Sequence, residues 1–378
     1  MKSMFPLATH IKERAHALGF ELAGIAAATP ADGFDRLRAW LDQGFAGEMA
    51  YMDRYAEARR HPSSILPEVR SVVMVGMNYN PGVSEKMGTG SGPSVENKEK
   101  FGNGPVPVPI FSRGKIARYA RGADYHDILR GRLKQLLAWI QQEAPNCRGR
   151  AVVDTAPLLE RDFARRAGLG WFGKNTMLIN KRLGSYFFLG ALLLDLELPA
   201  DPVHDTSHCG TCRACLDACP TQAFPAPGQL DSRRCISYLT IELRGPIPEE
   251  LREPMGDWLF GCDVCQEVCP WNRKAPPGTE PAFRPLPDLE AADPVELLSL
   301  SDAEFRSRFG STALTRTRRR GLLRNAAIVL GNQGDASVLP ALQRAREDPE
   351  PLVREAAAWA IARIHERIGC PVGSPVPG

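Results

Sequence analysis

The sequence lacks a long hydrophobic run, an apolar N-terminal segment and a strong excess of charge of either sign. Its longest apolar run, residues 186–194, has nine residues, whereas a membrane-spanning helix needs roughly 20. Residues 1–14 contain no apolar stretch of the length found in secretory signals. These absences predict a protein without a membrane span and favour the cytoplasm. The net charge is only +3, from 47 basic and 44 acidic side chains, so any acidic partner must be bound by a local patch.

The composition is that of an ordinary globular protein. Hydrophobic residues make up 43% and charged residues 24% of the 378 residues, which excludes a disordered tail, a collagen-like chain and a disulfide-stabilised mini-protein. At roughly 150 residues per domain, this length predicts two or three domains.

Residues 1–200 are predicted to form one mixed α/β (α+β) domain. Short apolar or β-branched runs predict strands, and apolar residues at helical spacing predict helices. The predicted strands are 72–75, 151–153 and 186–196, and the predicted helices are 30–43 and 128–140. Residues 80–110 interrupt the pattern with six glycines and five prolines between positions 81 and 109, which predicts a surface loop or lid.

Three further segments are predicted after residue 200. Residues 201–275 contain most of the cysteines, and 276–319 begin with a proline-rich stretch and are predicted to be a linker. Within 320–368, the sequence LRNAA is followed at an offset of 30 by VREAA. This repeat predicts two stacked helical hairpins of the HEAT type. Because about three repeats are usually needed for independent stability, we expect these to lean on the rest of the chain.

Eight of the ten cysteines lie between residues 209 and 269. In a chain without a leader, such a cluster is typical of metal ligation rather than of disulfides. The first run, Cys209-x2-Cys212-x2-Cys215-x3-Cys219-Pro, has the spacing of bacterial ferredoxins. Thiolates also suit zinc, but zinc sites usually pair two Cys-x2-Cys motifs across a longer gap, so the spacing favours iron–sulfur.

The second cysteine run is a variant of the first. Cys262, Cys265 and Cys269 keep the spacing, whereas Leu259 stands in the first position, and Cys235 is the obvious replacement. In two-cluster ferredoxins the cysteine before proline ligates the other cluster. The predicted ligands are Cys209, Cys212, Cys215 and Cys269 for the first 4Fe–4S cluster and Cys219, Cys235, Cys262 and Cys265 for the second. Cys147 and Cys370 are left over and are expected to be inert thiols.

Several motifs together resemble the epoxyqueuosine reductase family. They are VDTAP at 153–157, LER at 159–161, AGLGWFGKNT at 167–176, RYA at 118–120 with DYH at 124–126, RCISYLTIE at 234–242, and GCD at 261–263 with CPWN at 269–272. The resemblance covers about residues 5–365, including the terminal repeats. The motifs taken together are specific to this family, whereas no single motif is.

The resemblance implies a cobalamin-dependent iron–sulfur oxidoreductase. Such an enzyme would reduce epoxyqueuosine to queuosine at the wobble position of tRNA, the last step of queuosine biosynthesis. Electrons from an external donor of the flavodoxin or ferredoxin type would pass through both clusters to cobalt. The sequence lacks the Asp-x-His-x-x-Gly motif, because Leu129 occupies the glycine position after Asp124 and His126, so we expect base-off cobalamin.

By resemblance, Asp154 is the predicted proton donor, and its place in the sequence suits that role. It ends an apolar strand before a turn, and an apolar pocket can raise the pKa of a carboxyl group enough for it to donate a proton. Its alternative role is the N-cap of the following helix. Arg161 lies about two helical turns further on and is predicted to bind the substrate, with a solvated helix arginine as the alternative. By resemblance, cobalamin would contact Asp154, Arg59, Lys174, Asn175, Ser237, Asp263 and Val264.

Two arginine-rich segments, 306–324 and 113–134, are candidates for tRNA binding. The first contains seven arginines and no acidic residue. Such side chains can neutralise the phosphates of an anticodon stem-loop without contacting its bases. The alternative is a solvated basic face. The predicted tRNA contacts are Arg316, Arg318, Arg319, Arg320 and Arg324.

These observations predict a cytoplasmic monomer with a cobalamin-binding catalytic domain, a ferredoxin-like segment for two 4Fe–4S clusters and a HEAT-like end that helps to bind tRNA. Two other functions stay open. One is a cobalamin enzyme related to reductive dehalogenases that acts on a small substrate, although a small substrate needs no arginine-rich segment. The other is a non-catalytic carrier of the ferredoxin type, although a carrier needs no large N-terminal domain.

Overall fold

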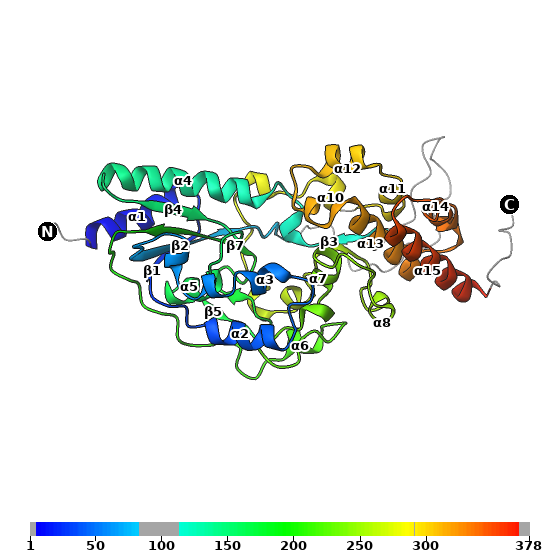
Figure 1. Cartoon of the computed structure of the whole chain (residues 1–378), viewed down its shortest axis with the longest axis horizontal. Coiled ribbons are helices and arrows are strands. Elements are labelled where there is room, and N and C mark those ends of the chain that lie inside the picture. The colour runs from blue at the N-terminus through cyan, green and yellow to red at the C-terminus, as the bar shows by residue number, and fades with distance from the viewer. Residues whose placement is uncertain (1–4, 83–112, 291, 370–378) are drawn as a thin grey trace, which may run out of the picture.

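The computed structural model describes residues 5–82, 113–290 and 292–369. Most of the predicted loop at 80–110 and the thiol of Cys370 therefore lie outside the described residues. The molecule is elongated, with the N-terminal sheet at one end and a group of C-terminal helices at the other (Figure 1).

One antiparallel sheet forms the centre of the N-terminal half. Its strands are arranged in the order β1 (Leu22–Ala27), β2 (Ser71–Asn78), β7 (Phe187–Leu194) and β4 (Gly149–Val152). Val73 lies opposite Ile25 on one neighbouring strand and Leu192 on the other. The three predicted strands are confirmed, and their antiparallel pairing makes this half an α+β structure.

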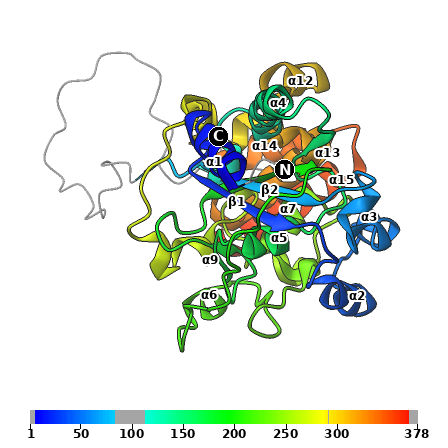
Figure 2. The ribbon, with the colours of Figure 1, turned by 90° about the vertical axis from the view of Figure 1, so that its left-hand side faces the viewer.

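Helices cover both faces of this sheet (Figure 2). On one face, α1 (Phe5–Ala17) and α4 (Tyr125–Glu143) pack on a core that includes Val73 and Leu192. On the other, α5 (Glu160–Arg166) packs on a core that includes Met74. Because β2 is buried on both faces, its sequence is a continuous apolar run rather than an alternating one.

Helix α4 follows from local sequence chemistry. Asp124 caps its N-terminus by accepting a hydrogen bond from the backbone N–H of His126 at 3.0 Å. Leu129, Leu133 and Leu136 recur at helical spacing and are fully buried. The predicted helix at 128–140 is therefore confirmed, and α2 (Phe34–Asp42) confirms most of the predicted helix at 30–43.

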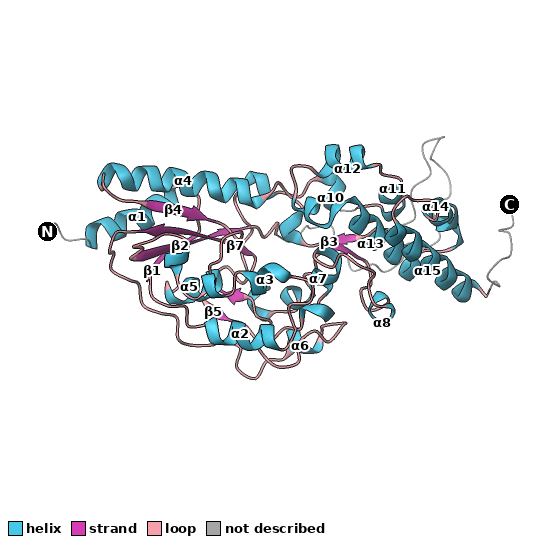
Figure 3. Ribbon diagram, viewed as in Figure 1, coloured by secondary structure: helices cyan, strands magenta, loops and turns pink. Residues whose placement is uncertain are grey.

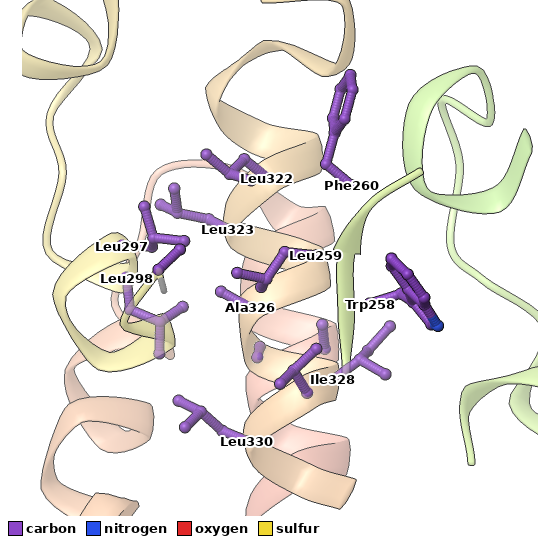
Figure 4. Close-up of a cluster of buried hydrophobic side chains, with 14 of the residues drawn as sticks. Trp258, Leu259, Phe260, Leu297, Leu298, Leu322, Leu323, Ala326, Ile328 and Leu330 are labelled. Atoms are coloured by element: carbon purple, nitrogen blue, oxygen red, sulfur yellow. The ribbon is translucent and has the colours of Figure 1, made fainter. Parts of the chain in front are cut away.

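The cysteine segment is not a separate unit. In this part of the chain, β8 (Trp258–Phe260) pairs in parallel with β3 (Lys115–Ile116), which precedes it by more than a hundred residues. Side chains of β8 pack against Leu323 and Ala326 of the C-terminal helices (Figure 4). One hydrophobic core therefore joins the segment after the predicted loop, the cysteine segment and the C-terminal helices.

The segment predicted to be a linker is a packed part of this core, so the linker prediction at 276–319 is wrong from residue 287 onward. It contains α10 (Pro287–Glu290), α11 (Pro294–Leu298), α12 (Asp302–Phe309) and the 3-10 helix η8 (Ala313–Thr317). Leu297 and Leu314 are fully buried, and Ser301 and Glu304 form a capping box at the start of α12. Proline at the start of α10 and α11 begins short helices here rather than marking an extended connection.

The C-terminal end is helical, as Figure 3 shows, and consists of α13 (Arg318–Gln333), α14 (Leu339–Ala345) and α15 (Pro351–Ile368). The two copies of the sequence repeat lie on α13 and α15, which pack closely, since a Cβ atom at Gly331 of α13 would lie only 3.0 Å from Cα of Ala360 on α15. The repeats share one core with β8 and α11, so the expectation that they lean on the rest of the chain is confirmed.

The remaining elements are short. They are α3 (Ala50–Arg54), α6 (Ala214–Asp217), α7 (Ile236–Ile241), α8 (Glu249–Arg252), α9 (Val264–Glu267), β5 (Trp171–Phe172), β6 (Leu178–Ile179), and the 3-10 helices η1 (Glu57–Arg59), η2 (Pro62–Ser64), η4 (Arg118–Ala120), η5 (Ser232–Arg234), η6 (Pro270–Asn272), η7 (Pro281–Phe283) and η9 (Ala336–Val338). Across the described ranges, every helix is too short or too polar to cross a membrane.

Candidate functional site

A cavity of about 430 Å³ lies where the sheet domain, the cysteine segment and η8 meet. The sheet domain contributes Asp154 and Phe188, the cysteine segment contributes Ser237 and Asp263, and η8 contributes Arg316. The cavity is therefore built by parts of the chain that are far apart in sequence.

Asp154 is held in this cavity by three side chains. Its backbone has a φ of +56°, an unusual conformation for a residue other than glycine. Its Oδ2 atom accepts a hydrogen bond from the Tyr125 hydroxyl at 2.5 Å and lies 3.5 Å from Nε2 of His126 and 3.5 Å from Nη2 of Arg316. Asp154 is not a helix cap, because Leu159 is the N-cap residue of α5.

The ionisation of Asp154 differs from the sequence-based prediction. Burial alone would raise its pKa, but hydrogen bonds from His126 and Tyr125 and the positive charge of Arg316 outweigh burial and lower the pKa to about 2. The expectation of a raised pKa is therefore wrong, and Asp154 is a carboxylate at neutral pH.

Arg316 belongs to the cavity rather than to an external basic face. Its Nη2 atom donates a hydrogen bond to the Tyr125 hydroxyl oxygen at 2.8 Å, and its guanidinium carbon lies 5.3 Å from the centre of the Tyr125 ring. The Tyr125 ring in turn stacks on Phe188 of β7, with 4.1 Å between ring centres. The prediction that Arg316 contacts tRNA phosphates from the surface is not supported by this placement.

Glu160 lines the cavity, although no role for it is predicted from the sequence. It is the first residue of α5, and its Oε1 atom is buried without a hydrogen-bond partner among the described residues. Burial raises its pKa to about 8, with a further contribution from the charge of Asp154. Its neighbour Arg161 also lines the cavity and donates a hydrogen bond to the backbone oxygen of Thr176 at 2.9 Å. The only signal for Glu160 in the sequence was its position beside Arg161.

The eight cysteines of the segment are all free thiols, as is Cys147. Most of the thiols whose charges act on one another fall into two neighbouring groups, joined by the effect of Cys215 on Cys265, and burial raises the pKa of several thiols in both. The groups are Cys209, Cys212, Cys215 and Cys269, and Cys219, Cys235, Cys262 and Cys265. They coincide with the two predicted ligand sets, and the four thiols of the second group line the cavity.

The spacing of these cysteines, rather than convergence on one point, is what indicates iron–sulfur clusters. Within the described ranges, no three Cys, His, Asp or Glu side chains converge on one point as the ligands of a single metal ion do. The four thiolates of a 4Fe–4S cluster each bind a different iron and need no such convergence. Gly261 directly precedes the second cysteine run and has a φ of +69°. A side chain at position 261 would place its Cβ atom only 2.5 Å from Cβ of Ala117, so glycine is required here.

A turn between β5 and β6 connects the cavity to both cysteine runs. Lys174 Nζ donates hydrogen bonds to the backbone oxygens of Gly210 and Cys212, at 2.7 and 2.8 Å. Asn175 Nδ2 donates to the backbone oxygen of Cys265 at 3.2 Å. Lys174 therefore supports the cysteine loop, which differs from its predicted contact with the cofactor.

The structure brings together most of the side chains predicted to contact cobalamin. Asp154, Asn175, Ser237, Asp263 and Val264 line the cavity, whereas Arg59 and Lys174 are not among the described lining residues. Asp263 is buried, and its Oδ2 atom accepts a hydrogen bond from the backbone N–H of Arg118 at 2.7 Å. Arg59 lies on η1, and its Nη1 atom is buried without a partner among the described residues.

The other predicted tRNA-binding arginines separate into exposed and buried ones. Arg318 is exposed and Arg320 is partly exposed. Arg319 forms an ion pair with Asp348 in which both side chains are largely buried. Arg324 is fully buried, and its guanidinium donates to the backbone oxygens of Leu239, Leu243 and Gly245. The assignment of Arg324 to tRNA binding is therefore wrong, and that of Arg319 is not supported, because their donors are used inside the protein.

Three family profiles match this chain. Residues 59–155 match the family described as epoxyqueuosine reductase QueG, DUF1730. Residues 208–272 match the 4Fe-4S double cluster binding domain, and residues 312–372 match HEAT repeats. The cluster-binding segment and the helical repeat expected from the sequence are thereby confirmed.

Whole-chain comparisons agree with the profiles. The epoxyqueuosine reductase of Pseudomonas aeruginosa is 43% identical over 361 residues, which cover 95% of each chain. That of Escherichia coli strain K12 is 42% identical over 374 residues, covering 98% of this chain and 93% of the relative. A crystal structure of epoxyqueuosine reductase with an epoxyqueuosine-modified tRNA-Tyr stem loop superposes with a TM-score of 0.83 at 32% identity, covering 96% of this chain and 91% of that one.

Proposed function

Because this chain belongs to the epoxyqueuosine reductase family, we propose that it removes the epoxide oxygen of epoxyqueuosine at the wobble position of tRNA and so forms queuosine, the last step of queuosine biosynthesis. One observation carries the proposal. A single cavity is lined both by Asp154 with its partners Tyr125 and Arg316 and by the four thiols of the second cysteine group. A proton-handling group and an electron-delivering group thus face the same space.

Two 4Fe–4S clusters would be held by the two cysteine groups and would supply one-electron transfer. The first group includes Cys212, which is exposed, whereas the second group lines the cavity. This order favours electron entry at the first cluster from an external donor of the flavodoxin or ferredoxin type and electron delivery to the cavity at the second.

The residues of the cavity also fit base-off cobalamin. Cobalamin carries amide side chains that donate and accept hydrogen bonds, and the cavity wall offers polar groups that can pair with them, among them the Ser237 hydroxyl and the Asn175 side-chain amide. Asn175, Ser237 and Val264 would line its binding site, and when bound it would supply a redox-active cobalt ion for breaking a carbon–oxygen bond.

The remaining cavity residues would handle the substrate. Asp154 would pass a proton to the departing epoxide oxygen, and Arg161, in the same cavity, would hold the modified base. Arg318 and Arg320 would contact phosphates of the anticodon stem-loop next to the cavity residue Arg316. We further propose that the chain works as a cytoplasmic monomer.

The test uses protein purified without oxygen, with its clusters reconstituted and cobalamin added. We expect about eight irons per chain, from two four-iron clusters, a corrinoid spectrum and conversion of epoxyqueuosine to queuosine in a tRNA stem-loop when a low-potential reductant is supplied. Asp154→Asn should keep the iron and the corrinoid and lose the conversion. Zinc in place of iron, or turnover unaffected by Asp154→Asn, would overturn the proposal.

The same experiment separates the two other functions expected from the sequence. An electron carrier would bind iron without taking up cobalamin and would not need Asp154. A dehalogenase-like enzyme would release halide from a small organohalide and leave the modified stem-loop unchanged.

A further inference from the structure

Glu160 stands between two cavities. It lines the cavity that contains Asp154 and also a second one of about 1030 Å³, on the side of α2. The two cavities share Glu160, Arg161, Thr176 and Leu230 in their walls. The Glu160 carboxyl group is therefore placed at a boundary that faces the reaction space.

Within the described part of the chain, the Glu160 carboxyl group forms no ion pair, and the one hydrogen bond that acts on its pKa comes from its own backbone N–H. Its Oε1 atom is buried and unpartnered, and so is Nη1 of Arg59, the nearby cation on η1. The charged groups that act on Glu160 are Asp154 from the loop after β4, Arg161 from α5 and Arg59 from η1. On the side of the second cavity, the charged lining residues are Asp32, Arg36, Asp162 and Arg165.

The proposed reaction needs more protons than Asp154 holds. Removing an epoxide oxygen as water breaks two carbon–oxygen bonds, forms one carbon–carbon double bond, and consumes two electrons and two protons. A low-potential one-electron reductant supplies the two electrons one at a time, and solvent water supplies one of the two protons, so one proton has to come from a group in the cavity. Asp154 holds no proton at neutral pH, because its pKa lies near 2.

We propose that Glu160 is the proton store of this cavity: it carries a proton in the resting enzyme and passes it, by way of Asp154, to the epoxide oxygen that leaves as water. This inference rests on the proposed function. The cavity is large enough to hold water between the two carboxyl groups, so direct contact between them is not required.

The electrostatics of the site are consistent with this division of roles. Burial raises the pKa of Glu160 to about 8, whereas that of Asp154 is lowered, so at neutral pH Glu160 carries a proton and Asp154 does not. Environments that push two carboxyl pKa values apart are typical of sites where one acid donates and the other stays charged. Glu160 acts through Asp154 here, so its role is to supply and position the proton.

The first test is spectroscopic and needs no turnover. Infrared spectra of the cluster-loaded protein should contain the carbonyl band of a protonated carboxylic acid that is lost as the pH rises through about 8. Glu160→Gln should remove the band, and the exposed control Glu143→Gln should leave it unchanged. Asp154→Asn should keep the band but move its midpoint to lower pH, because the Asp154 charge raises the pKa of Glu160.

The second test is kinetic and uses the cobalamin-loaded enzyme with the modified stem-loop in single turnover. The wild-type rate should fall as the pH rises through about 8, since Glu160 then loses its proton. Glu160→Gln should be about tenfold or more slower below that pH and lose this limb of the profile, and Glu160→Asp should recover part of the rate. Glu143→Gln is again the control.

Three results would overturn the inference. One is a wild-type infrared band in Glu160→Gln, and another is a wild-type rate and pH profile in that variant. The third is a variant that binds cobalamin more weakly but turns over normally once saturated, since Glu160 would then only hold the cofactor. If the proposed function itself were wrong, the wild-type enzyme would not convert the modified stem-loop at all, which distinguishes that outcome from the three above.

Discussion

The guanidinium of Arg316 donates a hydrogen bond to the Tyr125 hydroxyl oxygen at 2.8 Å, across 191 positions of sequence. The Tyr125 hydroxyl in turn donates to Asp154 at 2.5 Å. Arg316 lies on η8, directly before α13, the first helix of the C-terminal repeat. The part of the chain that leads into the HEAT-like helices thus completes the surroundings of the proposed catalytic carboxylate.

Arg316→Gln should raise the pKa of Asp154, because the positive charge of Arg316 is one of the causes that hold this pKa at about 2. The variant also loses the donor that orients Tyr125. We expect single-turnover conversion to slow by about tenfold or more, with stem-loop affinity changed little. The measurements are the rate against pH and the affinity at two salt concentrations.

Arg306→Gln is the matched control for Arg316, because Arg306 is an exposed arginine on the neighbouring helix α12. Its rate should equal that of the wild type. If Arg316→Gln weakened stem-loop binding and left the rate at saturating stem-loop unchanged, Arg316 would be a phosphate contact after all.

Arg318, which is exposed, and Arg320, which is partly exposed, should behave as phosphate contacts at the start of α13. A plot of log affinity for the stem-loop against log salt concentration has a negative slope. Each of Arg318→Ala and Arg320→Ala is expected to reduce the magnitude of this slope by somewhat less than one, while the turnover of bound stem-loop stays unchanged. Equal salt slopes for the wild type and the double variant would remove this surface from the proposed tRNA interface.

Arg324→Ala should instead destabilise the protein. It leaves the buried backbone oxygens of Leu239, Leu243 and Gly245 without their donors. We expect a loss of about 2–5 kcal/mol in the free energy of unfolding. Thermal unfolding of the cluster-loaded protein would measure it, and a stable variant with weaker tRNA binding would contradict it.

The burial of these arginines could not be predicted from the sequence. A count of charges along residues 306–324 cannot separate Arg318 from Arg324, because the face of α13 that is buried depends on where α7 and β8 lie. The helix itself was predictable, since its repeat is local in sequence. Burial of the predicted linker could not be inferred for the same reason: Leu297 and Leu314 are covered by residues distant in the chain.

The site shows a similar division. The cluster-binding segment could be predicted because most of its cysteines follow a spacing that is local in the sequence. The charge state of Asp154 could not, because it is set by Tyr125 and Arg316, which lie 29 and 162 positions away. Glu160 was visible in a motif, but its unpartnered, buried oxygen becomes apparent only when α5 is packed against the sheet.

The cysteine groups predict which cluster each substitution removes. Cys262→Ala should abolish the cluster at the cavity and stop turnover, while the cluster of the other group persists. Cys209→Ala should remove the outer cluster and leave the inner one reducible only by small chemical reductants. Iron content and electron paramagnetic resonance distinguish the two outcomes, with Cys147→Ala as a control that keeps both clusters. Loss of the same cluster in both variants would overturn the crossed ligand sets.

Glu160 and Asp154 should affect stability with opposite dependence on pH. Above the ordinary glutamate value of 4.5, an unfolded chain releases the Glu160 proton, whereas the folded chain keeps it until about pH 8. Glu160 therefore lowers the free energy of unfolding as the pH rises through this window, by at most about 5 kcal/mol. The melting temperature of Glu160→Gln, relative to that of the wild type, should therefore increase as the pH rises from 5 to 8.

The contribution of Asp154 to stability changes with pH in the opposite direction, because the pKa of Asp154 in the folded protein is lowered from 3.8 to about 2. Its contribution to stability is present above pH 3.8 and is lost as the pH falls through 2. Asp154→Asn should therefore be slightly destabilising at neutral pH, with a small effect because the side chain is 54% exposed. A gain in stability for Asp154→Asn at neutral pH would contradict the low pKa.

The shared C-terminal core predicts that the helical repeat and the cysteine segment unfold together. Leu323 is fully buried in the cluster that also contains Leu259 of β8, three residues before Cys262 (Figure 4). Leu323→Ala should cost about 2–5 kcal/mol through lost burial and the cavity left behind. Because the core is continuous, iron should be released at the same temperature at which α13 and α15 lose helicity, and both transitions should shift together in the variant. Iron release at an unchanged temperature, with only the helical signal shifted, would mean that the repeat unfolds independently of the cysteine segment.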